Sequence, residues 1–258
     1  MAHPEVKDEF VFYLKEKLNF KDRDIFINKE KKLTDIEDNL IKNFIKKKQV
    51  GIPLDYILNS TKFYEEEFYV DQRVLIPRPE TELLVDFINN QNFSRVKVLD
   101  AGTGSGCIGI SIALKNPKID VYGSDYSMDS LNVASINKDN LGVDNFYLIH
   151  SDWLTCFDNN SFDLIVSNPP YISEEDPHLN NLIHEPSRAL IASNQGLGDI
   201  KNIINQSKYS LKKGGMLLIE HGFNQPNEVN NILENNGFSD ISLLKDFQDH
   251  PRATLGIL

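Results

Sequence analysis

The sequence has few residues that bind metals or form disulfides, which argues against several classes of protein. Only two of its 258 residues are cysteines, Cys107 and Cys156, and they lack the close spacing of metal ligands. We expect both to be free thiols in a hydrophobic core rather than a disulfide. The six histidines are scattered, without a pattern such as His-Glu-x-x-His. The sequence therefore predicts no metal site.

Long apolar segments are also missing. No run of about 18 apolar residues occurs, so no segment is expected to cross a membrane. The first residues, MAHPEVKDEF, have neither the basic start nor the apolar stretch of a secretory signal. We therefore expect a cytoplasmic protein without a membrane partner.

Positive charge is in short supply outside the N-terminal region. The formal net charge is −11, with 27 Lys and Arg against 38 Asp and Glu. Residues 1–60 carry a net charge of +1 and the remainder carries −12. Because an acidic surface repels a phosphate backbone, we expect no nucleic acid partner. The charge suits a basic protein partner, although acidity can also serve solubility alone.

The order of helix and strand signals divides the chain into three segments. Residues 1–60 show apolar residues four apart, and a capping-box pair, Thr34 and Glu37, precedes a second apolar stripe. Residues 61–78 alternate around aromatic residues and end in prolines, which is typical of a hairpin. We predict an N-terminal helical domain (1–60), a β-hairpin linker (61–78) and a second domain (79–258).

From residue 95 onward, strand and helix signals alternate. This alternation predicts an α/β fold with a doubly wound, mainly parallel sheet and helices on both faces. The last two strand signals follow each other directly and are expected to close the sheet as a pair. The seven expected strands are at residues 96–99, 119–122, 146–149, 162–166, 216–219, 241–244 and 254–257.

The strand at 162–166 leads directly into Asn168-Pro169-Pro170-Tyr171, the NPPY motif. Two consecutive prolines forbid both ladder pairing and helix, so the chain must leave the sheet here. The Asn168 side-chain oxygen and a carbonyl of the proline segment can accept both hydrogens of a planar NH2 group, with Tyr171 packing on its flat face. Taken alone, these residues fit a purely structural role equally well, as the proline-terminated end of a strand followed by a turn.

A glycine-rich loop, Gly102-Thr103-Gly104-Ser105-Gly106, joins the first strand of the second domain to its first helix. Glycines allow a tight turn and a close approach of a ligand, and the helix start supplies free N–H donors. A dinucleotide fingerprint starting at Gly102 would need glycine at position 107, where the chain has Cys107. The spacing suits a ligand that has no pyrophosphate to bind.

Acidic residues follow the next two strands. Asp125, 23 residues after Gly102, can accept hydrogen bonds from both ribose hydroxyls of an adenosine group. Asp152 and Trp153 can bracket an adenine, with the indole ring stacking on it. Each also fits a structural role, as a turn aspartate and a core tryptophan. The ordered set of glycine loop, Asp125, Asp152-Trp153 and NPPY favours a cofactor site.

This order of motifs resembles the class I S-adenosylmethionine-dependent methyltransferases, and more closely the release factor glutamine methyltransferases (the PrmC or HemK family). Of the stretches that carry the closer resemblance, the IPRPETE block is the most specific. The resemblance covers the chain from about residue 50 to the end. The matching stretches are PLDYIL (53–58), LIPRPETELL (75–84), Glu185-Pro186 with Ala189-Leu190, and HPRATLG (250–256).

The resemblance implies that the chain transfers a methyl group from S-adenosyl-L-methionine, which becomes S-adenosyl-L-homocysteine. The implied acceptor is the side-chain amide of the glutamine in the Gly-Gly-Gln motif of class 1 peptide chain release factors. The resemblance also implies that the N-terminal helices dock the release factor, and we expect a monomer. The implied catalytic residues are Asn168, Pro169 and Tyr171, which bind the glutamine together with Pro170. The implied cofactor contacts are Gly102, Thr103, Gly104, Ser105, Gly106, Asp125, Asp152, Trp153 and Asn168.

Two other functions remain open at this point. A methyltransferase acting on the adenine amine of DNA or RNA is the alternative enzyme, because NPPY serves that planar NH2 group equally well. A non-catalytic assembly factor that keeps the cofactor fold as a scaffold is the alternative from another class. The acidic second domain disfavours the first, and the presence of both the glycine loop and NPPY disfavours the second.

Overall fold

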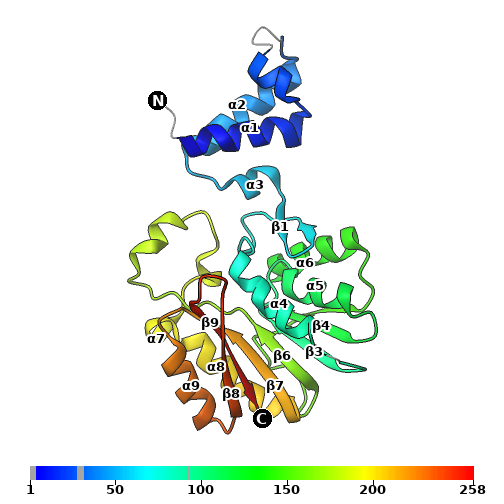
Figure 1. The fold of residues 1–258 in the computed structure, drawn as a ribbon, viewed down its shortest axis with the longest axis vertical. Coiled ribbons are helices and arrows are strands. Elements are labelled where there is room, and N and C mark those ends of the chain that lie inside the picture. The colour runs from blue at the N-terminus through cyan, green and yellow to red at the C-terminus, as the bar shows by residue number, and fades with distance from the viewer. Residues whose placement is uncertain (1–3, 28–31, 92) are drawn as a thin grey trace. The chain divides into compact units, whose positions relative to one another are not determined.

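The computed structural model describes residues 4–27, 32–91 and 93–258, and the chain divides into two compact units, Met1–Ser60 and Thr61–Leu258 (Figure 1). The first unit is helical. In it, α2 begins with the predicted capping box: Glu37 N donates to Thr34 Oγ1 at 3.2 Å, and Thr34 N donates to Glu37 Oε2 at 2.7 Å. Its elements are α1 (Pro4–Leu18), the π-helical turn η1 (Arg23–Ile27), α2 (Asp35–Gln49) and α3 (Leu54–Leu58). Its core contains Tyr13, Phe44, Ile57 and Leu58.

The second unit begins with an antiparallel hairpin of β1 (Thr61–Phe63) and β2 (Glu66–Phe68). Phe63 and Phe68 are almost fully buried, in the same hydrophobic cluster as residues of the helices α4 (Glu82–Asn89) and α5 (Cys107–Lys115). The hairpin therefore contributes to the core of the second unit.

A seven-stranded sheet forms the centre of the second unit. Its strands are β3 (Lys97–Ala101), β4 (Asp120–Asp125), β5 (Phe146–His150), β6 (Phe162–Ser167), β7 (Leu211–Glu220), β8 (Ser239–Lys245) and β9 (Pro251–Ile257). The order across the sheet is β5-β4-β3-β6-β7-β9-β8. Neighbours from β5 to β7 are parallel, and β9 is antiparallel to both β7 and β8. The predicted α/β fold with a mainly parallel seven-stranded sheet is confirmed.

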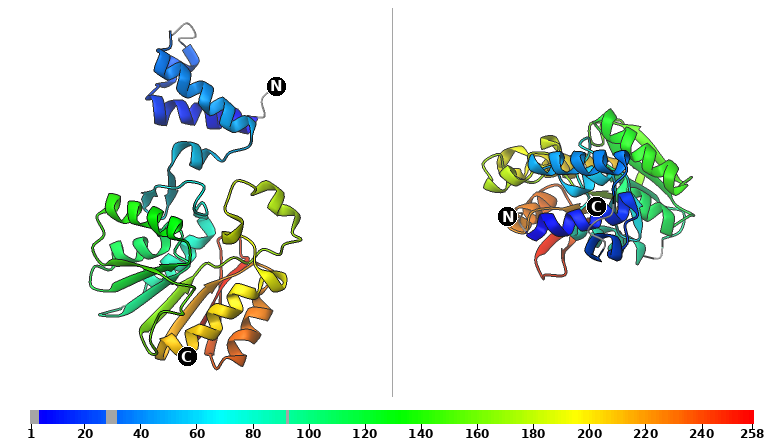
Figure 2. Two further views of the ribbon diagram at one scale, coloured as in Figure 1. Left: turned by 180° about the vertical axis from the view of Figure 1, so that it is seen from behind. Right: turned by 90° about the horizontal axis from the view of Figure 1, so that it is seen from above.

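Helices cover both faces of this sheet (Figures 1 and 2). One hydrophobic cluster contains residues of α4, α5 and the hairpin, and a second contains residues of α8 (Gly198–Ser210) and α9 (Pro226–Asn235). Alternate side chains of β3 divide between them, because Val98 belongs to the first cluster and Leu99 to the second. The remaining elements of this unit are η2 (Pro79–Thr81), α6 (Met128–Leu141), η3 (Pro177–Asn181), η4 (Ser187–Ala189) and α7 (Ser193–Gly196).

Both cysteines are free, but only one of them is in the core. Burial raises the pKa of the Cys107 thiol to about 12, whereas Cys156 is exposed. The expectation of a core thiol is therefore wrong for Cys156, which follows β5 in a surface turn. Within the described residues, no helix has the length and apolar character to cross a membrane, and no three His, Cys, Asp or Glu side chains gather as metal ligands.

Candidate functional site

The carboxyl ends of β3, β4 and β6 border a pocket of about 520 Å³ in the second unit. Parallel neighbouring strands end at the same edge of a sheet, so residues that follow them in the sequence come together there. Of the site residues predicted from the sequence, Gly102, Thr103, Gly104, Ser105, Asp125, Asp152, Trp153, Asn168 and Pro170 line this pocket. Gly106, Pro169 and Tyr171 are not among its lining residues.

The glycine loop turns at this edge through left-handed backbone conformations. Gly102 has a φ of +77° and Gly104 a φ of +55°, a region that favours glycine. A Cβ atom on Gly104 would meet no heavy atom within 4 Å, so the backbone here borders open space. A Cβ atom on Gly102 would lie 2.8 Å from Cζ3 of Trp153. The loop is thus open to a ligand at Gly104 and packed against the indole ring at Gly102.

Asp125, the last residue of β4, is fixed by two backbone donors. Its Oδ2 accepts from Gly104 N at 3.0 Å and its Oδ1 accepts from Ser127 N at 2.8 Å. Burial raises the pKa of this carboxyl, and the two N–H bonds partly offset the increase. Because each carboxylate oxygen can accept a second hydrogen bond, both oxygens remain able to bind a pair of neighbouring hydroxyls.

Trp153 is held in place from two sides. Its ring packs on Gly102, and on another side it is near the Asp199 side chain in α8, where it partly offsets the rise that burial causes in the Asp199 pKa. Asp199 also lines the pocket, whereas Asp152 lines it from an exposed position. The ring is therefore a fixed apolar wall of the pocket, suited to stacking on a flat aromatic ligand.

Asn168 presents its side chain to the pocket in a defined orientation. Its Nδ2 donates to Thr81 Oγ1 at 2.9 Å, and Thr81 is 2% exposed. Because Nδ2 is bonded to Thr81, the oxygen Oδ1 is the atom that Asn168 offers to a ligand. The two prolines that follow are buried, and Tyr171 Oη donates to Glu220 Oε1 at 3.2 Å.

Three contacts at the pocket or next to it are missed by sequence reasoning. Thr81 lies in the IPRPETE block, which enters the sequence argument only as a resemblance. The guanidinium carbon of Arg188 lies 3.7 Å from the centre of the Tyr126 ring, and both residues line the pocket, although no sequence pattern pairs them. Glu185 accepts from Arg78 Nη2 at 2.5 Å and from Ile76 N at 3.1 Å, so it joins two distant pocket segments.

Comparison with known proteins identifies the class. A family model described as a methyltransferase domain matches residues 92–247. The fold is similar to that of a 16S rRNA N2 G1207 methyltransferase from Thermus thermophilus, solved in complex with AdoMet and guanosine: the TM-score is 0.58 at 18% identity, covering 77% of this chain and 49% of that one. The chain is therefore a methyltransferase with the class I fold.

Relatives of similar length identify the family. The release factor glutamine methyltransferase of Escherichia coli K12 is 35% identical over 234 residues, which cover 88% of this chain and 83% of the relative. The enzyme of that name from Francisella tularensis is 37% identical over 236 residues, covering 89% of this chain and 83% of the relative. The chain belongs to the release factor glutamine methyltransferase family, as the motif resemblance predicts.

Proposed function

We propose that the chain transfers a methyl group from S-adenosyl-L-methionine to the side-chain amide nitrogen of the glutamine in the Gly-Gly-Gln motif of class 1 peptide chain release factors. The observation that carries this proposal is the hydrogen bond from Asn168 Nδ2 to Thr81, because it leaves an amide oxygen as the acceptor at the pocket. A planar NH2 group is the complementary donor.

The pocket fits S-adenosyl-L-methionine in three ways. The open backbone at Gly104 permits close approach, the Asp125 carboxylate suits the two ribose hydroxyls, and the fixed ring of Trp153 suits the adenine. We therefore assign the lining residues of the glycine loop, Asp125, Asp152 and Trp153 to the cofactor. When bound, the cofactor supplies a methyl group on a positively charged sulfur.

Positioning accounts for the chemistry that the protein supplies. An amide nitrogen is a poor nucleophile because its lone pair is delocalised into the carbonyl. Asn168 Oδ1 and the Pro169 carbonyl accept the two amide hydrogens, so the nitrogen is oriented toward the methyl group and can pyramidalise. Pro170 and the Tyr171 ring, whose hydroxyl is anchored on Glu220, border the flat group. Transfer of the methyl group to the nitrogen would break its bond to sulfur and leave S-adenosyl-L-homocysteine, and the methylated nitrogen then releases a proton to water.

The partner and the setting complete the proposal. The substrate is a cytoplasmic protein. The helical domain of residues 1–60 contacts this substrate, and the hairpin segment 61–78 leads to the methyltransferase domain. The net charge of −12 on residues 61–258 supports a protein substrate over a nucleic acid. We propose that the enzyme works as a monomer.

Mass spectrometry tests the function directly. A purified class 1 release factor and a nucleic acid are incubated separately with the protein and S-adenosylmethionine, with the Asn168→Ala variant as control. We expect a methyl group on the Gly-Gly-Gln glutamine with the natural chain and almost none with the variant. Methylated adenine without methylated glutamine would contradict the proposal.

A further inference from the structure

The two prolines of the NPPY motif cannot fix their own position through backbone N–H bonds. Pro169 and Pro170 have no N–H group, and both lie beyond β6, where pairing with the sheet has ended. The direction of the Pro169 carbonyl therefore depends on the residues that flank the prolines. Asn168 is anchored on one side by its bond to Thr81. The anchor on the other side must act at Tyr171.

Tyr171 is held at two atoms. Its hydroxyl donates to Glu220 Oε1 at 3.2 Å, and its carbonyl oxygen accepts from Gln225 Nε2, also at 3.2 Å. The next residue, Ile172, donates its N–H to Leu190 O at 3.0 Å and continues into a short parallel bridge. Because the Gln225 bond ends on the Tyr171 carbonyl, it acts directly on the backbone of the motif.

Both polar atoms of the Gln225 side chain are hydrogen-bonded. Gln225 immediately precedes α9 and is 7% exposed, and it is not among the residues that line the pocket. Its Nε2 also donates to Gln195 O at 3.2 Å, and its Oε1 accepts from Gly222 N at 2.8 Å. The opposite orientation would turn Oε1 toward two carbonyl oxygens. These contacts therefore fix which way the Gln225 amide faces.

A strained turn, residues 194–196, lies against the same carbonyl. Asn194, Gln195 and Gly196 all have left-handed backbone conformations, with φ of +52°, +57° and +85°. Residues other than glycine rarely adopt this region, so contacts with neighbouring segments must hold the turn. A Cβ atom on Gly196 would clash with the Tyr171 carbonyl oxygen. One side chain, that of Gln225, thus joins the turn and the NPPY motif.

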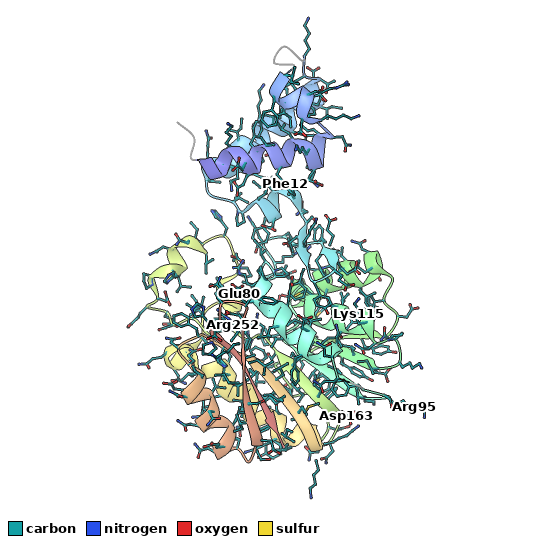
Figure 3. The ribbon with its side chains drawn as sticks, viewed as in Figure 1. Phe12, Glu80, Arg95, Lys115, Asp163 and Arg252 are labelled. Atoms are coloured by element: carbon teal, nitrogen blue, oxygen red, sulfur yellow. The ribbon has the colours of Figure 1, made fainter. Side chains whose placement is uncertain are left out.

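The loop that carries Gln225 is fixed to β9. His221 N donates to Arg252 O at 2.9 Å, and the fully buried His221 ring lies with its Nε2 2.9 Å from Thr254 Oγ1. Arg252 is labelled in Figure 3. The loop closes on itself, because Gln225 N donates to Gly222 O at 3.0 Å. The Gln225 side chain therefore extends from a rigid support.

We infer that Gln225 is a positioning residue that holds the Tyr171 carbonyl, and through it the Pro169 carbonyl, where the substrate amide requires it. With Thr81 as the anchor before the prolines and Gln225 as the anchor after them, the motif cannot shift along the sheet edge. The Pro169 carbonyl can then accept one amide hydrogen while Asn168 Oδ1 accepts the other. This inference rests on the proposed function, because that function gives the Pro169 carbonyl a hydrogen to accept.

Kinetics on the full chain, with labelled S-adenosylmethionine and a purified class 1 release factor, test this inference. As a carboxylate, Gln225→Glu keeps the acceptor for Gly222 N but loses both donors, and Gln225→Met loses all three bonds without adding a charge. We expect kcat to fall at least about tenfold in both, because a displaced carbonyl no longer orients the amide. Affinity for S-adenosylmethionine in calorimetry should not change, since Gln225 does not line the pocket.

Asn145→Asp is the matched control, because it makes the same change of amide to carboxylate at the opposite edge of the sheet. Asn145 precedes β5, and its Nδ2 donates to the carbonyls of Ala113, Asn116 and Ile119. We expect Asn145→Asp to lose stability in denaturant unfolding but to keep the natural kcat. A natural kcat in either Gln225 variant, an equal loss of kcat in Asn145→Asp, or cofactor affinity that falls in step with kcat would overturn the inference.

Hydrogen exchange followed by nuclear magnetic resonance needs no methyl transfer. The Ile172 N–H, which is bonded to Leu190 O, should exchange faster in Gln225→Glu than in the natural chain, and at the natural rate in Asn145→Asp. Faster exchange without release factor methylation would mean that the proposed function is wrong while the anchoring is right. Methylation with natural kcat and natural Ile172 exchange in Gln225→Glu would mean the reverse.

Discussion

Replacing Gly102 with alanine tests the packing of the glycine loop against Trp153. Two effects combine at this position, because Gly102 has a φ of +77° and its added Cβ would lie 2.8 Å from the Trp153 ring. Gly142, which ends α6, offers a matched control: its φ is +65°, but an added Cβ would meet nothing within 4 Å.

The Gly142→Ala control separates the cost of the left-handed backbone conformation from the cost of the clash with Trp153. A left-handed conformation costs an alanine about 1–2 kcal/mol, and this term is common to both variants. The clash at Gly102 adds the cost of overpacking, about 1–3 kcal/mol. We therefore expect Gly142→Ala to lower the free energy of unfolding by about 1–2 kcal/mol and Gly102→Ala by about 2–5 kcal/mol.

Denaturant unfolding followed by tryptophan fluorescence measures both quantities. Trp153 is the only tryptophan of the chain, so the emission of the folded protein reports on this ring alone. Gly102→Ala should change that emission because the ring must move, whereas Gly142→Ala should leave it unchanged. Equal losses of stability in the two variants, with identical emission spectra, would refute the proposed contact.

Three further substitutions test the site. Asn168→Ala should lower turnover about a hundredfold with little change in cofactor affinity, and near-natural turnover would contradict its role. Asp125→Ala should weaken S-adenosylmethionine binding in calorimetry at least tenfold. Burial raises the pKa of Asp125, so on acidification the natural chain should lose affinity at a higher pH than it would with an exposed aspartate. Glu185→Ala leaves Ile76 N without its acceptor and should lower the free energy of unfolding in denaturant by about 1–3 kcal/mol, and Glu185→Gln should lower it less. Equal losses in the two variants would argue against the bond between Glu185 and Ile76 N.

Features that depend on neighbouring residues could be predicted from the sequence. The capping box of α2 involves two residues three apart, and the strand that ends in NPPY is defined by its own apolar residues and prolines. The helices α8 and α9 also have apolar residues at helical spacing: Ile200, Ile203 and Ile204 of α8 are buried, as are Val229 and Leu233 of α9.

Contacts between distant segments could not be predicted in this way. The bond from Asn168 to Thr81 and the stacking of Arg188 on Tyr126 depend on how strands and loops meet at one edge of the sheet. Tyr171 shows the same limit: the sequence predicts a ring that faces a ligand, whereas the structure also ties its hydroxyl to Glu220. No periodicity or spacing encodes such pairs.

The position of β9 has a consequence for the synthesis of the chain. This strand, the last of the described residues, lies between β7 and β8, so β8 is made earlier but has no partner in the sheet until β9 inserts. A nascent chain that lacks β9 exposes two unpaired strand edges, which are open to association with other chains. Pairing of β8 with the sheet, and the placement of Arg252 near Glu220, therefore both depend on β9.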